Sequence, residues 1–432
     1  MSTTSLINLL PAAARLAPKT PQEVASALAE ARRDGRKLVV FSTGHGIPPI
    51  GDTSERILLD MSAFDGVEVD PATRVARIGG AARWSDLLAA ANLHGLTAPC
   101  GSASSVGVTG YMMGGGIGFM SRHLGLGCST IRSAELVTPD GHIRRIDAHS
   151  DPDLFWALRG GGGGFGVITS LELNLTPMPR MAAGVLGWGV EDADRVLKAW
   201  SSWTANLPED VTSAVRLVQV PEGPALTVIV VTAPREEDDL KTVLTPLTDL
   251  QPVLNTVRDT DPEAFMNEYG DPEIDPGAPP HAYEHVLLDQ LPAEACQLVA
   301  EFAQPEGGCG AMMVELRHLG GALGRPSTLG GAMDRIDGEF SLFVLGSIEA
   351  APAMAHAVDV LSDYGRGRTY FNFMPRRTGR QTAYRQETID RLSDLYEAID
   401  PDGVIDHPHP ISRTATVADE TAEAPAAASI PG

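Results

Sequence analysis

The chain has 432 residues, a formal net charge of −23 and the apolar content of an ordinary globular protein. Binding of nucleic acid needs clustered Lys and Arg, so this charge excludes nucleic acid as a partner and disfavours an anionic membrane surface. No apolar run is long enough to span a bilayer, and the N-terminus lacks the basic start of a secretion signal, so we expect a cytoplasmic protein.

The first part of the chain predicts an α+β region. A helix is expected over residues 20–34, because Thr20 and Glu23 form a capping box around Pro21 and apolar residues recur on one face until Gly35. The other expected elements are a strand at 37–42, a hairpin at 66–78, a helix at 84–93 and a strand at 133–138.

Composition changes at Pro177-Met178-Pro179, which we interpret as a domain boundary. Longer elements follow, and the segment 259–282, rich in Asp, Pro and Glu, predicts a loop over a site. The tail from Arg413 has no periodicity and is expected to be disordered. The elements expected between are strands at 225–233, 311–318 and 339–346, and helices at 235–250 and 292–303.

Two glycine-rich loops carry most of the functional information. One is Thr43-Gly44-His45-Gly46, and the other runs from Gly101 to Gly118. Glycine leaves backbone N–H groups uncovered, and such groups bind anions closely. We therefore predict a diphosphate cofactor between the loops, with the His45 imidazole as a nucleophile beside it. No strand–glycine–helix dinucleotide fingerprint and no P-loop lysine are found.

The motifs, in their order, resemble the berberine bridge enzyme-like branch of the vanillyl-alcohol oxidase and p-cresol methylhydroxylase flavoproteins. They are the T-G-H-G loop, Ser105 to Gly110, Gly114 to Gly118, Glu135 to Gly141, Asp153 to Gly161, Gly164 to Ile168 and Tyr370 to Phe373. The resemblance implies an α+β fold of two domains, in which the substrate domain is an antiparallel sheet backed by helices. The expected division is an FAD-binding domain at 1–178, a substrate-binding domain at 179–354, a C-terminal segment at 355–412 that returns to the FAD domain, and a tail at 413–432.

By resemblance, the cofactor is FAD and His45 bonds to the flavin 8α-methyl carbon; the simpler alternative is a histidine that only hydrogen-bonds near the flavin. Some relatives have a second, cysteinyl link, but Ala103 stands at that position here, so a single link is expected and Cys100 is a weak substitute. The other residues expected to bind the cofactor are Thr43, Gly44, Gly46, Ser102, Ser105, Val106, Gly107, Thr109, Gly110, Gly114, Gly115, Gly118, Val167, Ile168, Tyr370 and Asn372.

Tyr370 and Asn372 are expected to alternate on a strand, so that both side chains face the flavin while Phe371 and Phe373 pack behind. Hydride transfer from an alcohol, amine or phenol also needs a group that accepts the proton. Glu315 lies on one face of its strand and His318 on the other, and the sequence does not say which face looks at the flavin. The candidates are Tyr370, Glu315, His318, Tyr283, His285 and Tyr111, and for each alone a structural role is the simpler interpretation.

The four cysteines are scattered without a C-x-x-C pair, so neither a metal site nor a disulfide framework is expected. The predicted activity is oxidation of a small or medium organic molecule by hydride transfer to FAD, with molecular oxygen as the expected re-oxidant, in secondary metabolism. A dehydrogenase with another acceptor, a lyase or cyclase that retains flavin without net redox chemistry, and a non-catalytic flavin-binding protein remain alternatives.

Overall fold

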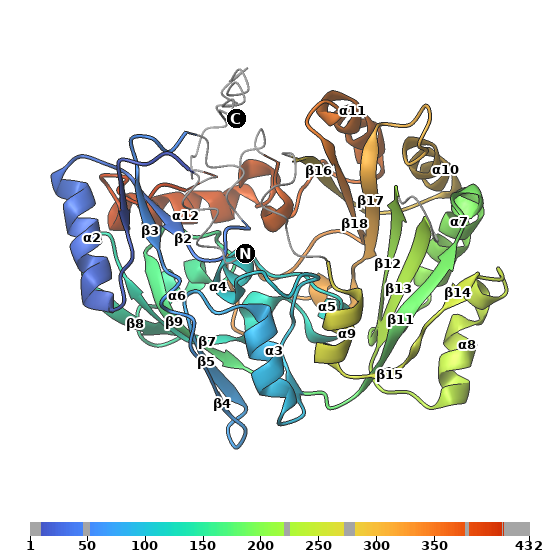
Figure 1. Ribbon diagram of the computed structural model, residues 1–432, viewed down its shortest axis with the longest axis horizontal. Coiled ribbons are helices and arrows are strands. Elements are labelled where there is room, and N and C mark those ends of the chain that lie inside the picture. Colours follow the sequence, from blue (N-terminus) through green and yellow to red (C-terminus); the bar gives the residue numbers. More distant parts are fainter. Residues whose placement is uncertain are drawn as a thin grey trace, which may run out of the picture.

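The computed structural model describes residues 10–45, 52–219, 225–271, 281–375, 380–407 and 409. Two regions lie side by side, one built by the first part of the chain and one by its middle part (Figure 1). The expected residues Gly46 and those of the tail at 413–432 lie outside the described residues.

The first region mixes small sheets and short helices, as its sequence predicted. A parallel sheet contains β1 (Ala14–Leu16), β3 (Ile57–Asp60) and β2 (Leu38–Phe41) in that order. A five-stranded antiparallel sheet contains β4 (Val67–Asp70), β5 (Val75–Gly79), β9 (Val167–Asn174), β7 (Ile131–Val137) and β8 (Ile143–Asp147). The remaining elements are α2 (Pro21–Arg33), α3 (Trp84–Asn92), α4 (Val108–Met113), α5 (Ser121–Leu124), α6 (Pro152–Leu158) and the pair β6 (Leu96–Thr97) and β10 (Thr176–Pro177).

Helix α2 shows why the local sequence was sufficient there. The Thr20 side chain accepts a hydrogen bond from the Glu23 N–H, Pro21 is the first helical residue, and Gly35 has a φ of +62° just beyond the end. Its apolar stripe of Val24, Leu28 and Ala31 is buried against Leu38 and Ile57 of the parallel sheet. The expected hairpin is likewise confirmed as β4 and β5.

The second region is one eight-stranded antiparallel sheet. The path of the sheet is β14 (Leu254–Asn255), β11 (Met181–Trp188), β13 (Leu226–Thr232), β12 (Val211–Val218), β17 (Ala311–His318), β18 (Phe340–Ser347) and β16 (His281–Leu288), and β15 (Arg258–Thr260) also pairs with β11. An antiparallel sheet backed by helices is therefore confirmed. The helices are α7 (Ala193–Thr204), α8 (Glu237–Thr248), α9 (Pro262–Tyr269), α10 (Ala293–Phe302) and α11 (Ala351–Leu361).

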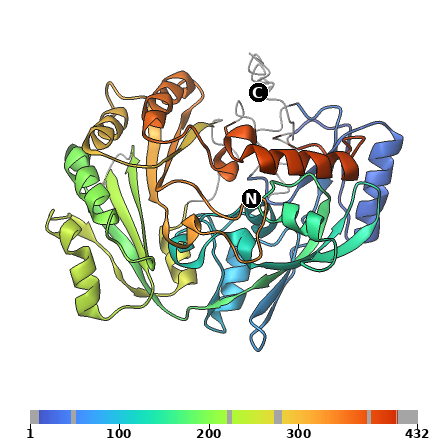
Figure 2. The same cartoon turned by 180° about the vertical axis from the view of Figure 1, so that it is seen from behind.

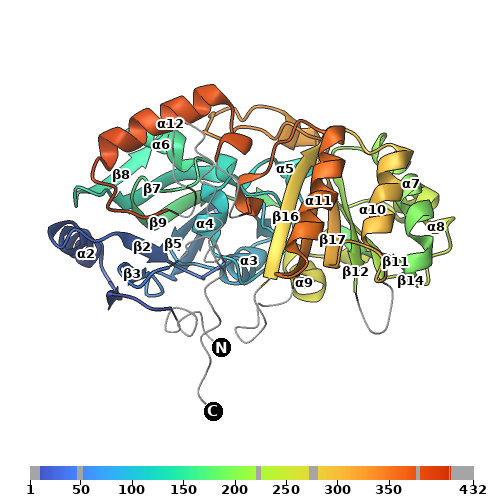
Figure 3. The same ribbon diagram turned by 90° about the horizontal axis from the view of Figure 1, so that it is seen from above.

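The two faces of this sheet differ in what covers them (Figure 3). Side chains such as Val215, Leu316 and Leu342 pack with Trp200 and Val299 of α7 and α10. The alternate residues share a core with the first region, and these are Met181, Ala183, Val185, Ala214, Ile229, Val231 and Leu287. We call this second surface the inner face; period-two alternation makes every second residue of each strand face the first region.

The expectation of a loop over 259–282 is wrong in its first half. Arg258–Thr260 pairs with β11, and Asp261 caps α9 by accepting a hydrogen bond from the Ala264 N–H. A short capped helix with Pro262 at its start is typical of an Asp-Pro-Glu sequence, so the acidic composition marked a helix start rather than a loop. Residues 272–280 lie outside the described part.

After α11 the chain passes back to the first region, where α12 (Gln386–Ile399) lies along α6 (Figures 1 and 2). Ile405 then pairs in parallel with Leu38 of β2. No helix in the described part of the chain combines the length and apolar character that a membrane crossing requires. Among the same residues, no cluster of three His, Cys, Asp or Glu side chains is placed to hold a metal ion.

Candidate functional site

The two glycine-rich loops meet although they are far apart in the sequence. The Gly107 N–H donates to Thr43 Oγ1 at 3.0 Å, and His45 Nε2 lies 3.1 Å from Ser105 Oγ. Gly44 has a φ of +87°, which side chains rarely tolerate. The structure thus brings together Thr43, His45 and the 105–107 segment, as a cradle for one ligand requires.

The second loop continues into helix α4, which starts at Val108 after the cap residue Gly107. Thr109 is buried, and its hydroxyl has no hydrogen-bond partner among the described residues. A methyl group added to Gly110 would meet open space, whereas Val106 packs against the core and its carbonyl accepts from Trp84 N–H. A buried hydroxyl without a partner is costly, so this corner fits a ligand that brings polar atoms.

The third part of the predicted cradle is Gly114 to Gly118, which passes tightly between other groups. A methyl group on Gly114 would overlap the Asn372 side chain, and one on Gly118 would overlap the Cys100 carbonyl. Gly115 has a φ of +104° and packs against Met333 and Tyr370. The glycines here are needed for close approach of backbone to neighbouring side chains.

The prediction that Tyr370 and Asn372 alternate on a strand is wrong. Residues Phe371–Phe373 form a turn of 3-10 helix, closed by hydrogen bonds from the Phe373 N–H to the Tyr370 carbonyl and from Met374 N–H to the Phe371 carbonyl. The two phenylalanines consequently point apart rather than packing together behind. Phe371 contacts Tyr384 and His407, whereas Phe373 contacts Phe343 and His285 of the inner face.

Tyr370 and Asn372 nevertheless reach the same place, because the turn brings them together. The Asn372 amide donates to Tyr370 Oη at 2.8 Å and to the Tyr111 carbonyl at 2.9 Å. Tyr370 Oη also accepts from the Gly116 N–H at 2.8 Å and the Ile117 N–H at 3.0 Å. Burial raises the pKa of Tyr370, and these backbone donors oppose that rise.

Val167 and Ile168 lie farther from these groups, at the start of β9. Their backbone pairs with Val137 and Leu136 of β7, and both side chains are buried. Contact of this backbone with an adenine ring stays a prediction.

Glu315 lies on the inner face of β17, the face that is turned toward the first region. Glu315 is 1% exposed and is bound by two arginines, at 2.5 Å by Arg216 Nε and also by Arg317 Nε. Arg317 donates onward to Ser102 Oγ at 2.9 Å, and Arg216 pairs with Asp271 at 2.6 Å. Burial alone would raise the pKa of Glu315, but the charges of Arg317 and Arg216 lower it to about 2. A carboxylate held in this way is a poor proton acceptor.

His285 and Tyr283 share the inner face with Glu315 but are already hydrogen-bonded. His285 Nδ1 accepts from the Tyr370 N–H at 3.2 Å and lies 2.7 Å from Thr369 Oγ1, and its Nε2 lies 2.9 Å from Ser341 Oγ. Burial and the nearby Arg317 charge lower the pKa of His285 to about 3, so the ring stays neutral. Tyr283 donates to the Met374 carbonyl at 3.1 Å.

His318 and Tyr111 are structural in this arrangement. His318 lies on the helix-covered face, where its ring stacks on Phe340 and Nε2 accepts from Arg122 at 2.9 Å. Burial, then the Arg122 charge, lowers the pKa of His318 to about 3. Tyr111 donates to the Pro99 carbonyl at 3.0 Å and fills the space beside Gly101 and Gly116. The Tyr111 hydroxyl and the His318 ring are thus bonded to groups outside the inner face.

Sequence reasoning missed Arg216, Ser341 and Phe343, which complete the inner face beside Glu315, Arg317 and His285. The signal for Arg216 was present: it is an arginine within the apolar strand Val211–Val218, where a long charged side chain needs a buried partner. Its partner could not be found without the strand pairing, because Glu315 is almost a hundred residues away.

Comparison with known proteins agrees with this architecture. A family model described as an FAD binding domain matches residues 12–147. The structure of 6-hydroxy-D-nicotine oxidase from Arthrobacter nicotinovorans superimposes with a TM-score of 0.82 at 23% identity, covering 95% of this chain and 96% of that one. A BBE-like protein of Physcomitrella patens gives a TM-score of 0.80 at 18% identity, covering 93% and 92%. The chain has an FAD-binding domain and the fold of the berberine bridge enzyme-like oxidoreductases.

This FAD-binding chain also resembles curated proteins over part of its sequence. It is 36% identical to (R)-6-hydroxynicotine oxidase of Paenarthrobacter nicotinovorans over 167 residues, which are 38% of this chain and 36% of that protein. The chain spans less than half of the length of the curated relatives it matches. The resemblance drawn from the glycine motifs is thereby confirmed.

Proposed function

We propose that the protein is an FAD-dependent oxidoreductase that oxidises a small or medium organic molecule and carries its flavin on His45. The observation that supports this proposal best is that segment 102–118 contacts both 43–45 and 370–372, and that its Ser102 is bonded to Arg317 on the inner face of the second sheet. Bound FAD supplies the hydride acceptor, and molecular oxygen is the re-oxidant in this proposal. A cytoplasmic role in secondary metabolism stays the expectation from sequence.

The residues present fit this cofactor. The Thr109 hydroxyl has no partner among the described residues, which suits a ligand that brings phosphate oxygens, whereas the N–H groups of Gly107 and Gly116 are already bonded within the protein. Ser105 holds the His45 ring in one orientation at the junction of the two loops. Ala103 stands where a second link would need cysteine, and burial raises the pKa of the Cys100 thiol to about 12, so one histidyl bond is proposed.

Tyr370 is the side chain best placed to take the substrate proton. Its oxygen accepts three N–H hydrogen bonds, an arrangement that stabilises a phenolate, and no acceptor for its own proton is found in the described part of the chain. Glu315 is neutralised by two arginines, and both ring nitrogens of His285 have hydrogen-bonding neighbours. The centroid of the Phe373 ring lies 5.3 Å from that of Tyr370 and 5.0 Å from that of Phe343, and these rings help to exclude water.

The substrate of the nicotine oxidases is not assigned to this protein. The sequence similarity to (R)-6-hydroxynicotine oxidase covers only part of the chain, and the structural similarity to 6-hydroxy-D-nicotine oxidase shows the fold alone. Anaerobic screening of alcohols, amines and sugars for bleaching of the flavin identifies it. Isomerisation without bleaching would instead favour a flavin-retaining lyase or cyclase, and a flavin that no compound bleaches would favour a binding protein.

The covalent link has a direct test. The purified protein is precipitated with acid, and the yellow colour is expected in the pellet. In His45→Ala the colour is expected in the supernatant, because the side chain that forms the bond is gone. The exposed His94→Ala is the matched control and keeps its colour in the pellet. A parent pellet without colour would reject the covalent bond, and a colourless native protein would reject FAD.

A further inference from the structure

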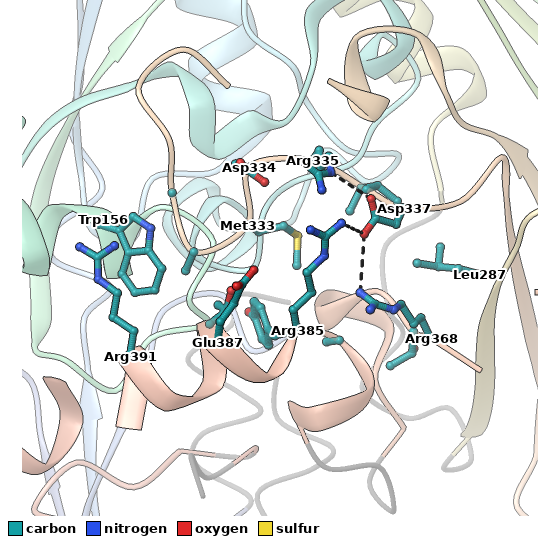
Figure 4. A pocket seen from close by; sticks show the side chains of 17 residues that line it. Trp156, Leu287, Met333, Asp334, Arg335, Asp337, Arg368, Arg385, Glu387 and Arg391 are labelled. Carbon is teal, nitrogen blue, oxygen red and sulfur yellow. Dashed lines mark hydrogen bonds and ion pairs between the residues drawn. The ribbon is translucent and has the colours of Figure 1, made fainter. Parts of the chain in front are cut away.

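A pocket of about 420 Å³ lies between α6, the segment 331–337 and the start of α12 (Figure 4). Leu287 of β16, from the inner face, forms part of its wall. The pocket adjoins the candidate site through two of its lining residues. Met333 packs against Gly115, and Thr369 precedes Tyr370 and contacts His285.

Three guanidinium groups converge on one carboxylate in this pocket. Asp337 Oδ1 accepts from Arg335 Nε at 3.0 Å, and Asp337 Oδ2 accepts from Arg385 Nη2 at 2.5 Å. Arg368 Nη1 lies 3.6 Å from Asp337 Oδ2, beyond hydrogen-bond distance (Figure 4). A guanidinium is a fork of several donors, so the three together present more donors than one carboxylate can accept. Of the three arginines, Arg368 makes the weakest contact with Asp337.

The position of Arg385 is unfavourable for the helix that it begins. It is the N-cap residue of α12, where its side chain makes no capping hydrogen bond. A cation there meets the positive end of the helix dipole, and Ser, Thr, Asp or Asn would stabilise the helix better. Stability of α12 therefore does not account for an arginine here, and the anion that Arg385 binds within the protein is Asp337.

The pocket is lined by one further arginine and by two further acids. Arg391 lies flat on Trp156 at 3.9 Å and is paired with Asp153 outside the pocket, so it stays apart from Asp337. Asp334 and Glu387 line the pocket as the other acids. With Asp337 they balance the formal charges of Arg335, Arg368 and Arg385, so what favours an anion here is the set of guanidinium donors that Asp337 leaves unused.

We propose that this pocket binds an oxyanion group, a carboxylate or a phosphate, through Arg368 and Arg385, with Asp337 as the internal anion that it joins or displaces. The pocket is continuous in sequence and contact with Tyr370, so the oxyanion belongs to the substrate of the proposed oxidation or to a separate anion bound beside it. The first of these readings rests on the proposed function.

The test uses inorganic phosphate as the probe and the full chain as isolated, at constant ionic strength, with binding measured by titration calorimetry. Arg368→Gln and Arg385→Gln are each expected to weaken phosphate binding by about tenfold or more, because each loses a charge-assisted hydrogen bond. Asp337→Asn is expected to tighten it severalfold, because the competing negative charge is gone. Arg366→Gln is the matched control: this arginine pairs with Asp289 outside the pocket and should leave binding unchanged.

The opposite sign expected for Asp337→Asn separates this proposal from a purely structural ion-pair cluster. If phosphate does not bind the parent, or binds Arg368→Gln and Arg385→Gln as tightly as the parent, the proposal is wrong.

A second experiment asks whether the oxyanion is part of the substrate. Carboxylic acids that bleach the flavin are compared with their methyl esters. An acid that loses at least about tenfold in kcat/KM in Arg368→Gln, with the ester unchanged, assigns the oxyanion to the substrate. Phosphate binding without that preference assigns a separate anion. Bleaching is measured independently of phosphate binding, so a failure of the oxidase proposal can be told apart from a failure of the anion-site proposal.

Discussion

At the scale of single residues, the phenol of Tyr370 is under two opposed influences. Burial in an apolar environment disfavours the phenolate and raises the pKa, while N–H donors from Gly116, Ile117 and Asn372 favour the phenolate. The net direction is upward from an ordinary value of 10. A proton acceptor of this kind is in its active, deprotonated form only at alkaline pH.

We therefore expect the rate of anaerobic flavin reduction to rise with pH through the alkaline range in the parent protein. Tyr370→Phe should lower that rate by roughly 10²-fold or more, since it removes the proton acceptor, and the alkaline rise should disappear. Stopped-flow absorbance of the flavin measures both. An unchanged profile in Tyr370→Phe would assign the proton to another group.

The buried Glu315 predicts a pH dependence of stability. Its pKa falls from 4.5 to about 2 in the folded protein, so its ion pairs stabilise the fold fully above the unfolded value and are lost as the pH falls toward 2. Glu315→Gln should cost about 3–5 kcal/mol at neutral pH, because it leaves buried arginines without their counter-charge.

Urea unfolding at a series of pH values checks this expectation. The difference between parent and Glu315→Gln should shrink below pH 4.5 and stay constant above neutrality. Glu209, whose pair with Arg325 is exposed, is the control: Glu209→Gln should lower the free energy of unfolding far less than Glu315→Gln does. A constant difference down to acid pH would contradict the assigned ion pairs.

At the scale of elements, local sequence was informative where a signal and its structure share the same few residues. The cap of α2, the β4–β5 hairpin and the strand at Ala311–His318 were all predicted in this way. The turn at Phe371–Phe373 was not, because four alternating residues fit a strand and a 3-10 turn equally well. What decides for the turn is packing: the two aromatic rings have partners on opposite sides.

The contact between α4 and this turn depends on the absence of a side chain at Gly114. Its φ of −91° is one that alanine adopts, so the cost of Gly114→Ala is the overlap with Asn372 and not the backbone. We expect a loss of about 1–3 kcal/mol in the free energy of unfolding and a displaced Asn372. Gly66→Ala, where a methyl group meets open space, is the control and should change stability little. Thermal and urea unfolding report both.

At the scale of the whole molecule, the two regions are joined by the buried guanidinium of Arg122, which no local sequence pattern predicts. Arg122 of α5 donates to the Val211 carbonyl at 2.8 Å, to the Leu319 carbonyl and to His318. These acceptors lie at the ends of β12 and β17 in the other region. The sequence predicted both regions and the convergence of loops 43–46 and 101–118, but it could not predict this junction, because its partners come from unrelated positions in the chain.

Arg122→Leu should lower the free energy of unfolding by at least about 2 kcal/mol, because it leaves buried carbonyl groups without hydrogen-bond donors. Tryptophan fluorescence, to which Trp200 beside His318 contributes, follows the transition during urea unfolding. Arg325→Leu removes an exposed arginine near the same junction and is expected to change stability far less. Equal effects of the two substitutions would show that Arg122 does not join the regions.

The order of the parallel sheet makes β2 its last strand, and that strand is completed by the far end of the chain: the Leu38 N–H donates to the Val404 carbonyl and the Asp406 N–H to the Leu38 carbonyl, both at 2.8 Å. During synthesis, more than 360 residues are added after Leu38 before the segment that covers this edge is made. Unpaired strand edges recruit other chains. Prematurely terminated products are therefore expected to aggregate. Nascent chains are expected to need protection by chaperones until the last segment pairs with β2.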